Sequence, residues 1–182
     1  MCTLIQARCS SYCPSVVYMC STGSDVLLYL VAHENAVCRV HPSALRFDGL
    51  EYGAGLFDCV CRVVIHAAES LVFAPDIVHA HDWHTALLPV YLHSGLRGSD
   101  AFRGARSVFT IHNLNYQGIS PAAAFPALGL HSRYFAPAAL EHFGELNRMK
   151  GGILFADQVT PVSPTYARET PTREQCPDHE GR

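Results

Sequence analysis

Residues 75–92 read PDIVHAHDWHTALLPVYL, and this stretch decides the fold of the chain. Its first part, residues 76–78, is short and apolar, which is typical of a buried strand. Residues 79–84 then bring together three histidines, an aspartate and the sole tryptophan. From residue 86 onward, apolar residues recur at helical spacing. A strand, a polar turn and a helix are the arrangement by which an open α/β sheet presents ligand-binding groups at the carboxyl ends of its strands.

The composition is that of a globular chain with little net charge. Of the 182 residues, 49% are hydrophobic and 16% are charged, and the formal net charge is -3 with histidine neutral. A chain of this length can bury a substantial core within one domain. The absence of a basic stripe argues against nucleic-acid binding. No apolar run approaches the length of about 18 residues that a membrane span needs.

The two ends of the chain lack the pattern of a folded core. Residues 1–24 are rich in serine and cysteine without a sustained period, so we expect a poorly ordered cysteine-rich leader there. The spacing of its cysteines does not form the paired C-x2-C motifs of a zinc site. Because no signal peptide is recognisable, we expect the cysteines of the chain to be free thiols. Residues 170–182 are expected to form a frayed tail, which leaves residues 25–169 for the folded domain.

Strand and helix patterns alternate between these ends. Apolar or β-branched runs predict strands at residues 25–31, 76–80, 107–111 and 158–162. Helical periodicity predicts helices at residues 57–71, 86–92 and 138–156, and from residue 163 onward. Residues 33–55 and 119–137 are expected to be loops. This alternation predicts an α/β fold, a Rossmann-like parallel sheet with helices on both faces.

Two of the predicted strands, 76–80 and 107–111, run directly into polar turns. If these strands are neighbours in a parallel sheet, both turns open at the same edge. Asp82 and Trp83 would then face His112 and Asn113 across one cleft. Aspartate accepts hydrogen bonds and histidine can donate or accept them, while the indole would form a flat apolar wall. This mixture predicts a pocket for a hydroxyl-rich ligand such as a sugar.

The same histidines also permit a second hypothesis, a metal site. His79, His81 and His84 around Asp82 are similar to the H-x-H-x-D-H ligand run of metallo-β-lactamase-type hydrolases. The register differs, since Asp82 stands one position too early after His79. A metal-dependent hydrolase that uses these three histidines is therefore kept as an alternative, whereas the sugar pocket predicts no metal and no cofactor.

Three stretches together resemble a known family. They are residues 75–92, SVFTIHNLNYQG at residues 107–118 and LNRMKGGILFADQVTPVSPTYARE at residues 146–169. In order and spacing they are similar to the N-terminal catalytic domain of bacterial and plastid-type glycogen (starch) synthases, which are ADP-glucose-dependent glucosyltransferases. The resemblance extends over residues 75–169 and is fainter from about residue 25.

The resemblance implies part of the first of two Rossmann-like domains in a GT-B glycosyltransferase. Such enzymes transfer glucose from ADP-glucose to the non-reducing end of an α-1,4-glucan with retention of configuration and without a required metal. By this resemblance His112 and Asp82 are catalytic, and Trp83, Asn113 and Tyr52 bind substrate. It implies no nucleic-acid or membrane partner, and a cytoplasmic location with the plastid as the alternative.

The chain also departs from the family pattern. The glycine-rich K-x-G-G-L loop is absent, and residues 51–55 read EYGAG where the family has an Asp-Asn pair after its active-site tyrosine. The donor-binding residues of the C-terminal domain are also missing. We therefore expect the chain alone to be inactive, and a non-catalytic glucan-binding remnant is a further alternative.

Overall fold

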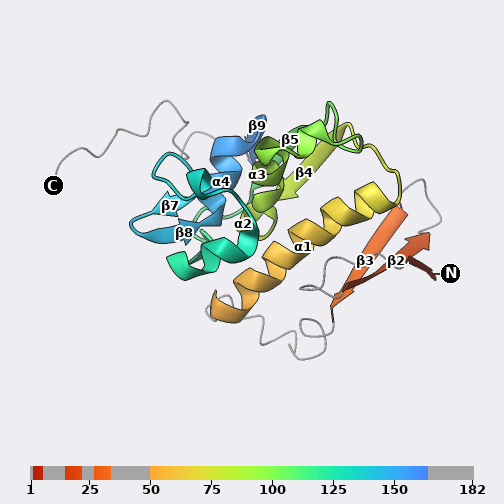
Figure 1. Cartoon of the computed structure of the whole chain (residues 1–182), viewed down its shortest axis with the longest axis horizontal. Coiled ribbons are helices and arrows are strands. Elements are labelled where there is room, and N and C mark those ends of the chain that lie inside the picture. The colour runs from red at the N-terminus through yellow and green to blue at the C-terminus, as the bar shows by residue number, and fades with distance from the viewer. Residues whose placement is uncertain (1, 6–14, 22–26, 34–49, 164–182) are drawn as a thin grey trace.

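A computed structural model describes residues 2–5, 15–21, 27–33 and 50–163 (Figure 1). Side chains are described from Gly55 onward, except that of Leu56. The predicted helix from residue 163, the tail at 170–182 and most of the predicted loop at 33–55 lie outside the described residues.

A parallel sheet forms the centre of the described structure. It consists of β4 (Ile77–His81), β5 (Arg106–Ile111) and β9 (Gln158–Pro161) in the order β4-β5-β9. Both strand pairs are parallel. The three strands predicted at 76–80, 107–111 and 158–162 and their parallel arrangement are therefore confirmed. Each crossover contains helical segments, as parallel neighbours require.

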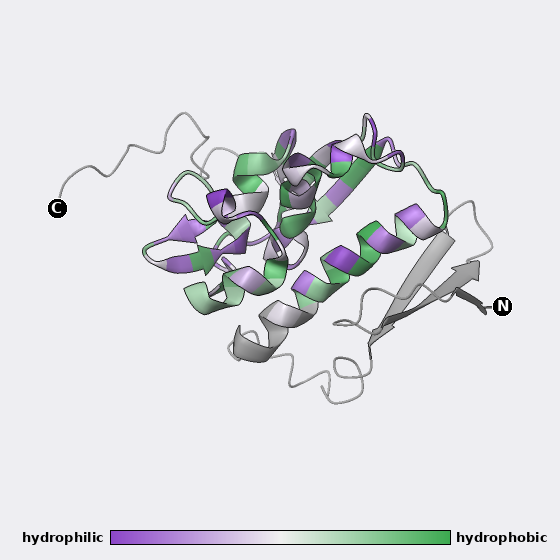
Figure 2. Ribbon diagram, viewed as in Figure 1, coloured by the Kyte–Doolittle hydropathy of each residue, from purple (hydrophilic) through white to green (hydrophobic). Residues whose placement is uncertain are grey.

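In the described residues, three helices pack on one face of this sheet: α2 (Asp82–Thr85), α3 (Leu87–Ser94) and α4 (Arg148–Phe155). The long helix α1 (Leu50–Ser70) packs in turn on α2 and α3. All residues of α3 from Leu87 to Leu92 are buried. Figure 2 shows hydrophobic and hydrophilic residues alternating along α1, the pattern of an amphipathic helix with one face on the core. Successive strand residues face opposite sides: Ala80 is fully buried, whereas Ile77 is 53% exposed on the other face.

A second, antiparallel sheet contains the N-terminal strands. β1 (Cys2–Ile5), β2 (Ser15–Ser21) and β3 (Leu27–His33) pair in the order β1-β2-β3. In the view of Figure 1, β2 and β3 lie on the opposite side of α1 from the parallel sheet.

These N-terminal strands correct two predictions. The strand expected at 25–31 exists as β3, but it pairs antiparallel with β2 instead of joining the parallel sheet. The leader expected to be poorly ordered contains β1 and β2. The run Val16-Val17-Tyr18 has β-branched and aromatic residues that favour strands. An apolar run alone does not specify the direction in which its neighbour runs.

The segment before α4 corrects the helix predicted at 138–156. Only its second half is helical, and a small antiparallel sheet precedes it: β6 (Ile119–Pro121), β7 (Glu141–His142) and β8 (Glu145–Asn147), in the order β6-β8-β7. Phe143 and Gly144 have φ values of 51° and 82° and form the turn between β7 and β8. The backbone at these two positions cannot continue a right-handed helix. Short 3-10 helices at Ala122–Leu128 and Ser132–Tyr134 occupy much of the predicted loop at 119–137.

Two cysteines in α1 have different states. Cys61 is a free, fully buried thiol, and its burial raises its pKa to about 12. Cys59 is disulfide-bonded, which corrects the prediction of free thiols at that position. Sequence spacing does not reveal this bond, because it depends on which Cβ atoms the fold brings together.

None of the described helices has the length and apolar content that crossing a bilayer requires.

The paired glycines of α4 allow the helix to approach the sheet closely. A Cβ atom on Gly152 would lie 2.7 Å from the ring of Phe109, which is fully buried in β5. A Cβ atom on Gly151 would lie 3.0 Å from Val90. A close contact therefore explains the two glycines that disfavour the helix by propensity.

We expect Gly152→Ala to lower the free energy of unfolding by about 1–3 kcal/mol, because the Phe109 ring must move to admit the methyl group. Urea denaturation measures this change. Gly55→Ala in α1 is the control, since a Cβ atom there meets nothing within 4 Å. We expect the control to be neutral or stabilising by up to about 1 kcal/mol. Equal effects of the two changes would contradict the close-contact explanation.

Candidate functional site at the ends of two parallel strands

The polar turns after β4 and β5 are joined by the carboxylate of Asp82. Its Oδ1 atom accepts hydrogen bonds from the backbone N–H groups of His112 at 2.8 Å and Asn113 at 3.2 Å. Because β4 and β5 are parallel neighbours, their carboxyl ends meet at one edge of the sheet. The structure thus brings together three of the predicted site residues, Asp82, His112 and Asn113.

Asp82 reaches the second turn through an unusual backbone conformation. Its φ is 54°, in the left-handed region, which aspartate enters more readily than most residues. Thr85 supports this turn on the other side, since its hydroxyl accepts from the N–H of His81 at 2.6 Å and donates to the carbonyl of His81 at 2.9 Å. The strand therefore ends sharply at His81 and the Asp82 side chain is directed toward β5.

Trp83 lies beneath the turns instead of facing solvent. The residue is only 5% exposed, and its ring contacts Phe57 edge-on with centroids 5.1 Å apart. A Cβ atom on Gly118 would lie 2.5 Å from the indole, so the loop backbone packs directly on the ring. Helix α2 starts at Asp82 and turns the Trp83 side chain toward the core, so the part of the indole that could form the predicted flat apolar wall is small.

The histidines divide into two groups. His79 and His81 lie on the exposed face of the sheet: Nε2 of His79 is 2.7 Å from Oγ1 of Thr110, and Nδ1 of His81 is 3.0 Å from Nε2 of His112. His84 instead stacks on Trp83 at a centroid distance of 4.3 Å.

The hydrolase alternative needs these histidines to converge on one ion, and they do not. In the part of the chain that the structure describes, no group of three His, Cys, Asp or Glu side chains is arranged to hold a metal ion. The arrangement therefore gives the metal-dependent hydrolase hypothesis no support.

Burial affects the charge of two histidines at the site. The pKa of His81 is lowered by burial and by the neighbouring rings of His79 and His112, against the opposite effect of Asp82. Burial also lowers the pKa of His84, again with Asp82 opposing. Since an unperturbed histidine titrates near 6.5, both rings are mainly neutral at pH 7. A neutral imidazole can donate one hydrogen bond and accept another, which suits a ligand with hydroxyl groups.

Asn113 has a further contact, and Tyr52 is the remaining predicted site residue. The Oδ1 atom of Asn113 accepts from the N–H of Asn115 at 3.0 Å and so shapes the loop after β5. Tyr52 is in the first turns of α1, and its side chain lies outside the described part of the chain.

A buried ion pair that sequence reasoning missed anchors the site loop. The guanidinium of Arg148, 1% exposed, binds both carboxylate oxygens of Asp58 at 2.6 Å. The same guanidinium donates to the carbonyl of Gly118 at 3.0 Å and to Oγ of Ser120 at 2.9 Å. Charged residues are rarely fully buried unless they are paired. The apolar residues on both sides of Asp58 in the sequence indicate that it lies on the buried side of α1, but they do not identify its partner.

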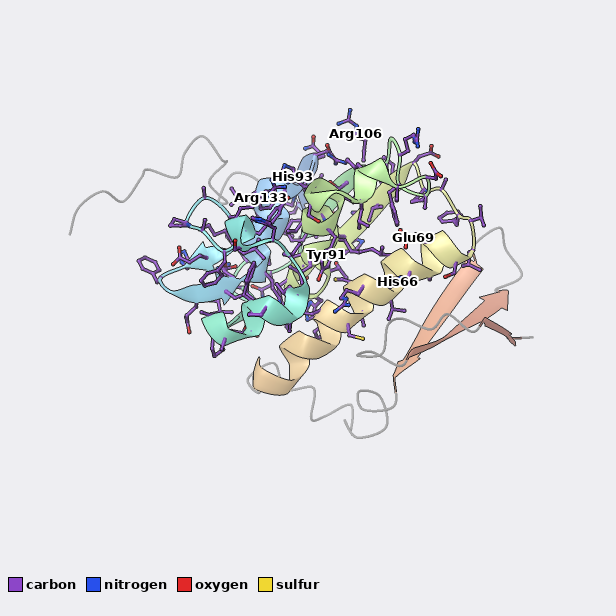
Figure 3. All side chains as sticks on the ribbon, viewed as in Figure 1. His66, Glu69, Tyr91, His93, Arg106 and Arg133 are labelled. Atoms are coloured by element: carbon purple, nitrogen blue, oxygen red, sulfur yellow. The ribbon has the colours of Figure 1, made fainter. Side chains whose placement is uncertain are left out.

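A separate hollow of about 360 Å³ lies between α1 and α3. Figure 3 labels His66 and Glu69 on α1 and Tyr91, from α3, beside that helix. The Tyr91 hydroxyl donates to the carbonyl of Leu128 at 2.9 Å, and burial raises the pKa of this phenol. None of the predicted site residues whose side chains are described lines this hollow.

Comparison with known proteins defines the class to which this fold and site belong. The structure is similar to the catalytic domain of starch synthase IV from Arabidopsis thaliana bound to ADP and acarbose, with a TM-score of 0.72 and 27% sequence identity over 89% of this chain and 33% of that one. The class is therefore the GT-B glycosyltransferases, and the chain contains part of a Rossmann-like domain. The model of the starch synthase catalytic domain family matches residues 5–181. The chain belongs to this family.

Bacterial relatives agree with this assignment. Glycogen synthase 2 of Geobacter sulfurreducens is 47% identical over 151 residues, which are 82% of this chain and 31% of the relative. The glycogen synthase of Leptothrix cholodnii is 52% identical over 137 residues, 75% of this chain and 27% of the relative. The resemblance found in the sequence motifs is thus confirmed, and the chain spans about a third of the length of these relatives.

We expect Arg148→Met to lower the free energy of unfolding by about 3–5 kcal/mol, because it leaves the Asp58 carboxylate buried without its partner. Urea denaturation measures this loss. Arg103→Ala is the matched control: it removes the exposed ion pair with Asp100, which is worth at most about 1 kcal/mol. If Arg148→Met cost no more than the control, the anchoring role would be wrong.

The carboxylate of Asp82 joins the two turns. We expect Asp82→Ala to reduce the hydrogen-exchange protection of the His112 and Asn113 amides, because both lose their acceptor. A hydrogen bond to a charged group is worth about 1.5–3 kcal/mol, so exchange should accelerate at least roughly tenfold. Asp82→Asn keeps an acceptor oxygen and should retain most of the protection. Unchanged exchange in Asp82→Ala would show that the carboxylate does not hold the turns together.

Proposed function

We propose that this chain forms one wall of the active site of an ADP-glucose-dependent glucosyltransferase that extends an α-1,4-glucan with retention of configuration. The observation that carries the proposal is the junction of Asp82 with the His112-Asn113 turn at the strand ends, in a chain of the starch synthase family. The similar Arabidopsis domain was bound to ADP, and ADP is the group that leaves when glucose is transferred from ADP-glucose.

In the proposed reaction, the bond between the anomeric carbon and the phosphate oxygen of ADP breaks. A new bond forms between that carbon and a hydroxyl oxygen at the non-reducing end of the glucan, whose proton is released. His112 is exposed at the strand end and would lie against the donor glucose at the reacting centre. Catalysis would come from holding the two sugars in position and stabilising the leaving phosphate.

The remaining site residues would act around this centre. Asp82 would fix the His112 and Asn113 backbones in place and present its second oxygen to the sugar. Asn113 and Tyr52 would bind substrate, and Trp83 would support the pocket from below through its contact with Gly118. We place the reaction in the cytoplasm, because the relatives are glycogen synthases of bacteria, with the plastid as the alternative.

Transition-state stabilisation requires contacts from both sides of the reacting sugars. Because the chain spans about a third of its relatives, we propose that the 182-residue chain by itself transfers no glucose. Incubation of the purified chain with ADP-glucose and glycogen should release no ADP, whereas a complete protein that contains this chain should release it. ADP release by the 182-residue chain would overturn the proposal of inactivity.

In that complete protein we expect His112→Ala to reduce kcat/KM by roughly 100-fold or more, the effect of losing a group that stabilises the transition state. Because His112 is exposed, its removal should leave the Tm unchanged. His142→Ala is the control, an exposed histidine on β7, and should retain full activity. A complete protein that binds glycogen but transfers no glucose would favour the non-catalytic glucan-binding alternative.

A further inference from the structure

A direct contact between two histidine rings joins the ends of β4 and β5. His81 is the last residue of β4, and His112 directly follows β5. Their Nδ1 and Nε2 atoms are 3.0 Å apart, a hydrogen-bond distance, and the ring centroids are 5.3 Å apart. The contact therefore links a residue without an assigned role to the proposed catalytic histidine.

His81 is held on several sides. Its backbone N–H and carbonyl both bind the Thr85 hydroxyl, and its ring lies against that of His79 with centroids 4.2 Å apart. His79 is itself fixed to Thr110 at 2.7 Å, and Thr110 to Thr160 of β9 at 2.8 Å. This chain of contacts crosses all three strands of the sheet, so the His81 ring has a rigid support.

We propose that His81 is a positioning residue that orients the His112 ring and determines which of its nitrogens carries the hydrogen. The inference rests on the proposed function of His112 at the donor sugar. Between the two facing nitrogens one must carry a hydrogen and the other a lone pair. The tautomer of one neutral ring therefore fixes the tautomer of the other, and His112 presents a defined face to the ligand.

The groups around the two rings come from both turns and from β9. The titratable groups that face His81 are His79 on its own strand, His112 after β5 and Asp82 at the start of α2. From β9 the group in contact with this network is Thr160, which carries no charge.

The test is nitrogen-15 NMR of the histidine side chains in the 182-residue chain. In the unchanged protein we expect His81 and His112 to adopt one complementary pair of neutral tautomers. His81→Phe keeps a flat ring but removes the hydrogen bond, so His112 should become a mixture of tautomers. His81→Asn places an amide near the original Nδ1 position, so it should restore a hydrogen bond to Nε2 of His112 and recover part of the tautomer preference. The control, His79→Gln, removes the adjacent ring but not the His81–His112 contact, so the tautomer should persist.

The proposal fails if His112 has the same tautomer in the unchanged protein and in His81→Phe. If that variant does not fold, mixed tautomers of His112 in the unchanged protein also contradict the proposal. In the complete protein, His81→Phe should lower kcat roughly tenfold, the value of one hydrogen bond, with little change in KM, and His81→Asn should recover most of this loss. If the complete protein transferred no glucose at all, the proposed function would fail while the NMR result would still decide the role of His81.

Discussion

The buried pair of Arg148 and Asp58 is the interaction on which the rest of the structure depends. A buried guanidinium is stable only if its N–H donors are satisfied, and that of Arg148 is 1% exposed. It donates four hydrogen bonds, which are accepted by Asp58 of α1, by the carbonyl of Gly118 and by Ser120 of β6. The pair therefore fixes α4 against α1 and holds the loop that follows His112. The sheet positions the ends of β4 and β5, whereas this ion pair fixes the path of the loop after β5 through Gly118 and Ser120.

From this anchor, the geometry of the site follows in a short series of contacts. The loop backbone at Gly118 rests on the Trp83 ring, and the carboxylate of Asp82 holds the amides of His112 and Asn113. Polar residues at this edge therefore serve two purposes: some shape the turns and others remain available to a ligand. Parallel strands bring such residues together regardless of their separation in sequence.

Much of the parallel sheet and the meeting of Asp82 with His112 could be predicted from the sequence. The runs at β4, β5 and β9 are short, apolar and bounded by polar turns. This local pattern is typical of buried parallel strands, and these strands do form the central parallel sheet. The prediction failed where local pattern is ambiguous. Leu140, Phe143 and Leu146 recur every three residues, which is compatible with a helix, but the positive φ at Phe143 makes a hairpin. The burial of Trp83 and the Arg148–Asp58 pair depend on tertiary contacts between distant segments, which no local pattern contains.

The contact between Gly118 and Trp83 has a consequence for how this site can change. The thickness of the indole sets the height of the loop above the core, so a buried side chain defines the depth of the space next to His112. A smaller ring at position 83 would lower that floor, and a side chain at position 118 would raise it. In the proposed ligand site, the dimensions would thereby depend on a buried ring and a loop glycine, and substrate preference would change through positions inside the protein.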